Sequence, residues 1–123
     1  MKHLSTILIV DDEPLGRETL EGLLIGQSYD LAFASNGQEA LAKAAELIPD
    51  LILLDVMMPI MDGPATIRAL QRINPQVKVI AASGLRTNEK ATEIASLGIG
   101  SLLSKPYTAE ELLNNLHEIL SAQ

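Results

Sequence analysis

Residues 51–55 read LILLD, four apolar residues followed directly by a carboxylate. A strand that is apolar at every position is buried on both faces, which is typical of a parallel sheet covered by helices. Two other nearly uninterrupted apolar runs also end at polar residues: 6–10 is followed by Asp11 and Asp12, and 77–82 is followed by Ser83. The pattern predicts parallel strands whose carboxyl ends bring polar side chains to one edge of a sheet.

Helix-period segments alternate with the apolar runs. Shorter strands are expected at 31–34 and 101–103, and apolar residues at helical spacing follow each strand, including a fourth helix around 91–95. Three signals mark helix starts: Pro14 suits a first helical position, Thr108 with Glu111 makes a capping box, and Ser35 with Gln38 is a second candidate box. The alternation predicts a doubly wound three-layer α/β domain, (βα)5, with a parallel five-stranded sheet. We expect the flavodoxin-like fold class, in which the strand order is 2-1-3-4-5.

The composition indicates one globular domain. The 123 residues, 47% of them apolar, are predicted to form a single domain over 1–123 with its core at about 6–120. The chain has no cysteine, which excludes a disulfide framework or a thiolate metal site and fits a reducing cytosol. No apolar run approaches the roughly 20 residues that cross a bilayer, and no secretory signal is recognisable. We expect a cytoplasmic protein without membrane insertion.

The net charge limits the classes of binding partner that are expected. Sixteen acidic residues against nine basic ones give a formal net charge of −7, which repels nucleic-acid phosphates. The aromatic residues, which could stack on bases, are only Tyr29, Phe33 and Tyr107. Direct nucleic-acid binding is therefore not expected. The acidity suits a divalent cation or a basic partner surface, although many soluble proteins are acidic for solubility alone.

In the predicted sheet order, the first and third strands are neighbours, so Asp11, Asp12 and Asp55 would lie together. Three adjacent carboxylates resist full ionisation until a cation neutralises them, and a small hard ion with oxygen ligands, Mg²⁺, is expected. A carboxylate can also act as a nucleophile that forms an aspartyl phosphate. The metal, the Ser83 hydroxyl and the Lys105 ammonium could then each take one phosphoryl oxygen.

Each of these residues also has a structural interpretation. A single aspartate after a strand is commonly a turn former or helix cap, Ser83 before a glycine is typical of a turn, and Lys105 alone would be a surface lysine. The adjacent pair Asp11 and Asp12 is harder to explain in this way, because two like charges packed together cost stability. The combination therefore favours a functional site.

Four motifs carry a family resemblance: VDDEP at 10–14, LILLDVMMPIMDG at 51–63, AASG at 81–84 and SKP at 104–106. In this order and spacing, they resemble the receiver domain of two-component response regulators, from about residue 6 to the end. The stretches 61–85 and 105–113 are similar to receiver modules attached to hybrid sensor histidine kinases.

The resemblance implies a role for each site residue. Asp55 would be phosphorylated by a phosphohistidine donor, either a sensor histidine kinase or a histidine phosphotransfer protein. The implied Mg²⁺ ligands are Asp12, Asp55 and the Met57 backbone carbonyl directly, and Asp11 through water. The implied phosphoryl contacts are Ser83 and Lys105, and the bond before Pro106 would be a cis peptide. The implied docking face, and a possible dimer interface, comprises the fourth helix, fifth strand and fifth helix.

Two departures from the family pattern stand out. Leu102 occupies a position where receiver domains commonly have an aromatic switch residue. Tyr107 lies on the other side of Lys105 and so cannot replace that residue. Met57 and Leu85 are apolar at positions where polar residues help to orient water in relatives, which predicts slow hydrolysis of the aspartyl phosphate.

Two other functions remain open at this point. An aspartate-nucleophile phosphohydrolase would need an acid/base aspartate two residues after Asp55, where this chain has Met57. A phosphate-independent interaction module would not need the complete set of Asp11, Asp12, Asp55, Ser83 and Lys105. We therefore predict a phosphorylation-controlled signalling domain that is not an enzyme on other substrates.

Overall fold

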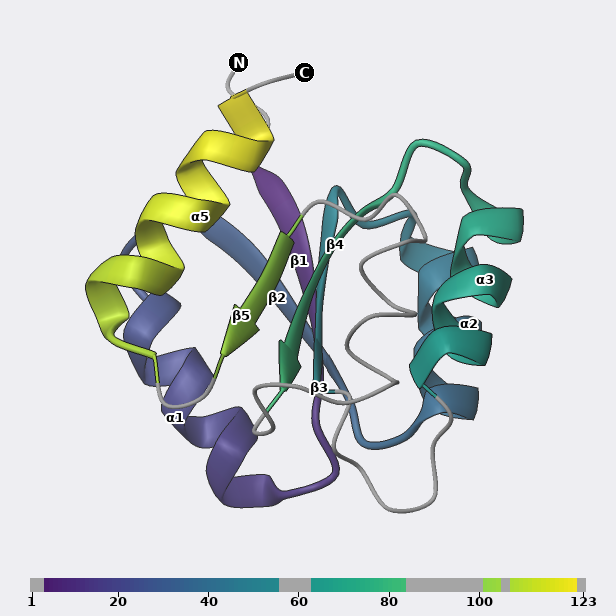
Figure 1. Cartoon of the computed structure of the whole chain (residues 1–123), viewed down its shortest axis with the longest axis horizontal. Coiled ribbons are helices and arrows are strands. Elements are labelled where there is room, and N and C mark those ends of the chain that lie inside the picture. Colours follow the sequence, from purple (N-terminus) through teal and green to yellow (C-terminus); the bar gives the residue numbers. More distant parts are fainter. Residues whose placement is uncertain (1–3, 56–62, 84–100, 105–106, 122–123) are drawn as a thin grey trace.

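The computed structural model describes residues 4–55, 63–83, 101–104 and 107–121 (Figure 1). Its elements follow one another in the order β1 (Ser5–Val10), α1 (Pro14–Leu24), β2 (Tyr29–Ala34), α2 (Gly37–Leu47), β3 (Leu51–Asp55), α3 (Gly63–Ile73), β4 (Lys78–Ser83), β5 (Ser101–Ser104) and α5 (Ala109–Ser121). The predicted strands are all present, with ends shifted by one or two residues. The helix expected around 91–95 lies outside the described residues.

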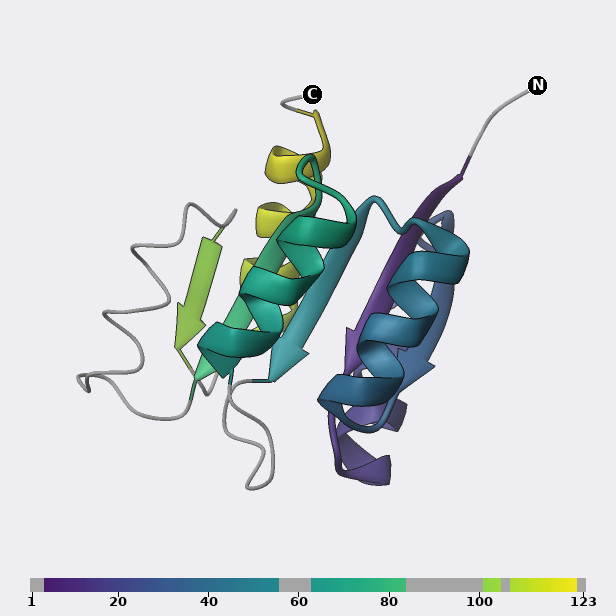
Figure 2. The same cartoon turned by 90° about the vertical axis from the view of Figure 1, so that its right-hand side faces the viewer.

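The five strands form one parallel sheet of order β2-β1-β3-β4-β5, as the sequence predicted. Figure 2 shows the strands side by side in this order. Helices α1 and α5 cover one face of the sheet, and α2 and α3 cover the other (Figures 1 and 2). The fold is therefore the expected three-layer, flavodoxin-like α/β arrangement.

The apolar stretch of β3 is buried on both faces, because each face has its own core. Leu51 and Leu53 pack with side chains of α1 and α5, whereas Ile52 and Leu54 pack with those of α2 and α3. All four are at most 5% exposed. Full burial of one such side chain contributes about 1.5–3 kcal/mol, so this strand anchors both layers and fixes the position of Asp55 at its end.

The capping predictions had different outcomes. Pro14 begins α1, and the box at α5 is confirmed: the Glu111 N–H donates to Thr108 Oγ1 at 3.0 Å, and the Thr108 N–H donates to Glu111 Oε1 at 2.9 Å. The box predicted for Ser35 and Gln38 is wrong.

Helix α2 is instead capped one residue later, by Asn36. The Glu39 N–H donates to Asn36 Oδ1 at 2.8 Å, and the Glu39 carboxylate accepts from the Ser35 N–H at 2.6 Å. The reason is the stronger acceptor: with Asn36 as the cap, the Glu39 carboxylate lies at the third helical position and accepts from the otherwise unpaired Ser35 N–H, whereas Gln38 would offer only a neutral amide. The Ser35 N–H accordingly lowers the pKa of the Glu39 carboxyl below its ordinary value.

Among the described residues, no helix is long and apolar enough to cross a membrane.

Candidate functional site

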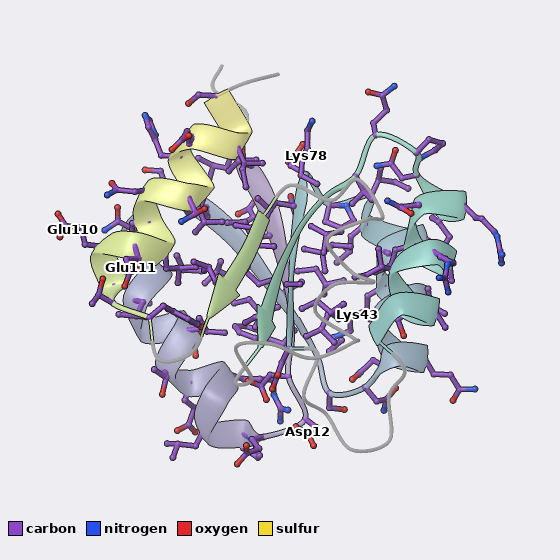
Figure 3. All side chains as sticks on the ribbon, in the orientation of Figure 1. Asp12, Lys43, Lys78, Glu110 and Glu111 are labelled. Atoms are coloured by element: carbon purple, nitrogen blue, oxygen red, sulfur yellow. The ribbon has the colours of Figure 1, made fainter. Side chains whose placement is uncertain are left out.

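Three carboxylates meet at the carboxyl end of the sheet. Asp11 follows β1, Asp55 ends the neighbouring strand β3, and each of Asp11, Asp12 and Asp55 offers an oxygen within 4.8 Å of the others. Asp11 and Asp55 are only 6% and 8% exposed, and Asp12 is partly exposed. Figure 3 shows Asp12 beyond the arrowheads of the strands, while Lys78 marks the opposite end of the sheet. The structure thus brings together the trio that the sequence predicted.

Asp11 is held by its neighbours in the chain and by β2. Its backbone N–H donates to the Ala34 carbonyl at 3.0 Å, and its carbonyl accepts from Arg17 Nη1 at 2.6 Å. Its side-chain Oδ1 accepts from the Glu13 N–H at 3.0 Å. The first turn of α1 and the edge of the sheet together orient this carboxylate.

The role of Arg17 was missed in the sequence. A basic residue near the start of a helix is unfavourable for the helix dipole, and this was the available signal. In the structure, the guanidinium reaches back to the Asp11 carbonyl and so links α1 to the end of β1.

Tyr107 was also missed. Its position in the sequence gave it no predicted part in the site, yet Tyr107 lines a small cavity of about 20 Å³ together with Asp11 and Asp55. Burial raises the pKa of the Tyr107 phenol, and the charges of Asp11 and Asp55 raise it further. The half-buried ring also packs against the core between α1, α5 and the sheet, so it joins the carboxylate cluster to that layer.

The remaining predicted site residues are placed only in part. Ser83 is the last residue of β4 and pairs with Ser104 of β5, one step beyond the pairing of Asp55 with Ala82. Met57, Lys105 and Pro106 lie outside the described residues. The metal-binding carbonyl, the lysine contact, the cis peptide and the role of the Ser83 hydroxyl therefore stay predictions.

The carboxylate cluster has the chemistry of a site for a hard divalent cation. Two unit charges separated by 4.8 Å repel by about 3.5 kcal/mol at an effective dielectric constant of about 20. Oxygen ligands from three carboxylates, two of them buried, suit Mg²⁺, which prefers oxygen and would offset this repulsion. The residues present fit the ion that the sequence predicted.

Comparison with known proteins gives the family. The family model described as the response regulator receiver domain matches residues 7–117. The chain is 35% identical over 115 residues to the transcriptional regulatory protein ZraR of Salmonella typhimurium strain LT2, covering 94% of this chain and 26% of that protein. It is 31% identical over 114 residues to the chemotaxis protein CheY of Thermotoga maritima, covering 92% of this chain and 95% of CheY.

A solved structure agrees. The crystal structure of a CheY-like response regulator receiver domain protein from Methanospirillum hungatei JF-1 superimposes with a TM-score of 0.91 at 27% identity, covering 98% of this chain and 96% of that one. The chain spans about a quarter of the length of the ZraR proteins it matches.

The chain belongs to the response regulator receiver domain family of two-component systems. Receiver domains are signalling modules that generally bind Mg²⁺ at an acidic pocket and interact with histidine kinases or phosphotransfer proteins. The resemblance to receiver domains seen in the sequence is confirmed, and the similarity to receiver modules of hybrid sensor histidine kinases stays a prediction.

Proposed function

We propose that this receiver domain accepts a phosphoryl group on Asp55 from a phosphohistidine donor in a Mg²⁺-dependent reaction. The donor is a sensor histidine kinase or a histidine phosphotransfer protein. The observation that supports this proposal is the position of Asp55, which ends a fully buried strand and meets Asp11 and Asp12 within 4.8 Å.

Asp55 is the nucleophile of the proposed transfer, and its neighbours are the metal ligands. An Asp55 carboxylate oxygen forms a bond to phosphorus as the P–N bond of the donor breaks, and the donor's imidazole nitrogen keeps the electron pair. Asp12, Asp55 and the Met57 carbonyl would hold the ion directly, and Asp11 would hold it through water. When bound, Mg²⁺ supplies positive charge that offsets the carboxylates and the phosphoryl oxygens.

Other residues receive and retain the phosphoryl group. Ser83 and Lys105 contact its oxygens, and a cis peptide before Pro106 directs the lysine toward the site. Because the side chains of Met57 and Leu85 cannot hold an attacking water, the aspartyl phosphate hydrolyses slowly. A half-life that does not shorten in Met57→Asn would contradict this last point.

Phosphorylation is proposed to act on a partner through one face of the domain. Phosphorylation changes the face formed by the fourth helix, β5 and α5, which docks a partner or a second copy of the domain. In this proposal, residues 1–123 form one domain with its core at about 6–120. The domain functions in the cytoplasm and does not bind nucleic acid directly.

The test is phosphorylation by acetyl phosphate followed by intact-protein mass spectrometry. With Mg²⁺, the wild type should gain one phosphoryl group, and with EDTA it should gain none. Asp55→Asn should abolish the adduct, whereas Asp30→Asn, which neutralises an exposed carboxylate of β2, should retain it. An adduct that persists in Asp55→Asn would refute the assignment, and multiple turnover of small phosphate esters would favour a phosphohydrolase.

A further inference from the structure

Helix α1 has a glycine, Gly16, directly beside the Asp11 carboxylate. A Cβ placed on Gly16 would lie 2.3 Å from Asp11 Oδ2 and 2.8 Å from Asp11 Cγ, far inside van der Waals contact. Gly22, on the same helix, has nothing within 4 Å of its corresponding Cβ position. The Asp11 carboxylate therefore occupies the space that a side chain at position 16 would fill.

The conformation of the helix does not explain this glycine. Gly16 lies within α1 and is not among the described residues with a positive φ, whereas Gly26, after the helix, has a φ of 84°. Glycine is a poor helix former, so at this position it lowers the stability of α1 relative to alanine. The close approach of Asp11 is the structural reason for it.

The backbone of Asp11 cannot move to make room. Its N–H is bonded to the Ala34 carbonyl, and its own carbonyl accepts from Arg17. The carboxylate, by contrast, is the end of a short side chain held through the Glu13 N–H at 3.0 Å. A methyl group at position 16 would therefore rotate the carboxylate out of its place while β1 and α1 stay where they are.

We propose that Gly16 is a positioning residue for the acidic site: by lacking a side chain, it lets the Asp11 carboxylate lie against α1 and face Asp12 and Asp55. Gly16 itself does not bind the ion or the phosphoryl group. The inference rests on the proposed Mg²⁺-dependent function, but its geometric part concerns only Asp11 and α1.

The first test compares Gly16→Ala with the matched control Gly22→Ala by isothermal titration with MgCl₂. Displacing a group that orients a metal ligand costs about 10–100-fold in affinity, so we expect Gly16→Ala to weaken Mg²⁺ binding by about tenfold or more. Gly22→Ala should bind Mg²⁺ as the wild type does and should melt at a higher temperature, because alanine favours the helix. Wild-type affinity in Gly16→Ala would overturn the inference.

The second test asks whether the effect passes through Asp11. In EDTA, Gly16→Ala should raise the melting temperature less than Gly22→Ala does, or lower it. In an Asp11→Ala background, the clash is absent, so Gly16→Ala should raise the melting temperature as Gly22→Ala does there, and it should leave the residual Mg²⁺ affinity unchanged. Equal effects of Gly16→Ala with and without Asp11 would refute the positioning role.

These outcomes separate the inference from the function on which it rests. A wild type that binds no Mg²⁺ would contradict the proposed function, whereas the coupling between Asp11 and Gly16 in the melting temperatures would still test the geometry. If Gly16→Ala does not fold, the double variant Asp11→Ala/Gly16→Ala should fold. Failure of both would show that the obstacle at position 16 is not Asp11.

Discussion

Neutralising one member of the carboxylate cluster should stabilise the domain when no divalent cation is present. Asp12→Asn keeps the size of the side chain and removes two repulsions, with Asp11 and with Asp55, across at most 4.8 Å. Each repulsion is about 0.9 kcal/mol at the dielectric constant of water and about 3.5 kcal/mol at an effective value of about 20. Because Asp12 is partly exposed, we expect a total gain near the lower limit, about 1–2 kcal/mol.

Urea and thermal unfolding at low ionic strength measure this gain. In EDTA, the melting temperature of Asp12→Asn should exceed that of the wild type by roughly 5 °C, given the entropy of unfolding of a domain of this size. The matched control Asp30→Asn replaces an exposed carboxylate of β2 away from the cluster and should have little effect. Added NaCl should reduce the difference, because salt screens the repulsion.

Magnesium should reverse the order of stability. Ligand binding to the folded state stabilises it by RT ln(1 + [L]/Kd), and the wild type should gain more than a variant that has lost a ligand. A variant that is less stable than the wild type in EDTA would refute the electrostatic reasoning. An equal gain on adding Mg²⁺ would show that Asp12 does not contribute to the site.

Two further predictions concern backbone strain and titration. Ile48 follows α2 in a left-handed conformation, with φ 47° and ψ 64°, and is 54% exposed. This conformation is costly for a β-branched residue, so Ile48→Gly should raise the free energy of unfolding by about 1 kcal/mol and shift the urea midpoint upward. A lower midpoint would contradict this prediction. In a Tyr29→Phe background, ultraviolet titration should give a pKa for Tyr107 above the ordinary value of about 10. Asp55→Asn should lower this pKa only part of the way, because burial, the larger cause, remains. Since the folded-state pKa is raised, the stability associated with the neutral phenol should be lost as the pH rises above about 10; a Tyr107 pKa unaffected by Asp55→Asn would contradict the observed geometry.

The start of α2 is a place where the sequence prediction failed. It named Ser35 with Gln38 and overlooked Asn36 with Glu39, which have the same spacing one residue later. The hydrogen bonds select Asn36 and Glu39 because the carboxylate accepts from the Ser35 N–H and hydroxyl together. At α5, where Thr108 and Glu111 had no competing pair, the sequence was sufficient.

The amino-acid sequence by itself determined the parallel sheet and placed Asp11, Asp12 and Asp55 at one of its edges, whereas the order that makes β1 and β3 neighbours comes from the flavodoxin-like fold class. The reason is that continuous apolarity, as in β3, is stable only between two layers of helices, and the residues that end such strands share one edge. The positions of Gly16 and Tyr107 beside this cluster depended on the tertiary structure. No local periodicity encodes them: Gly16 comes close to the Asp11 carboxylate only when α1 packs against the sheet, and Tyr107 lines a cavity with Asp11 and Asp55 only when the segment before α5 does so.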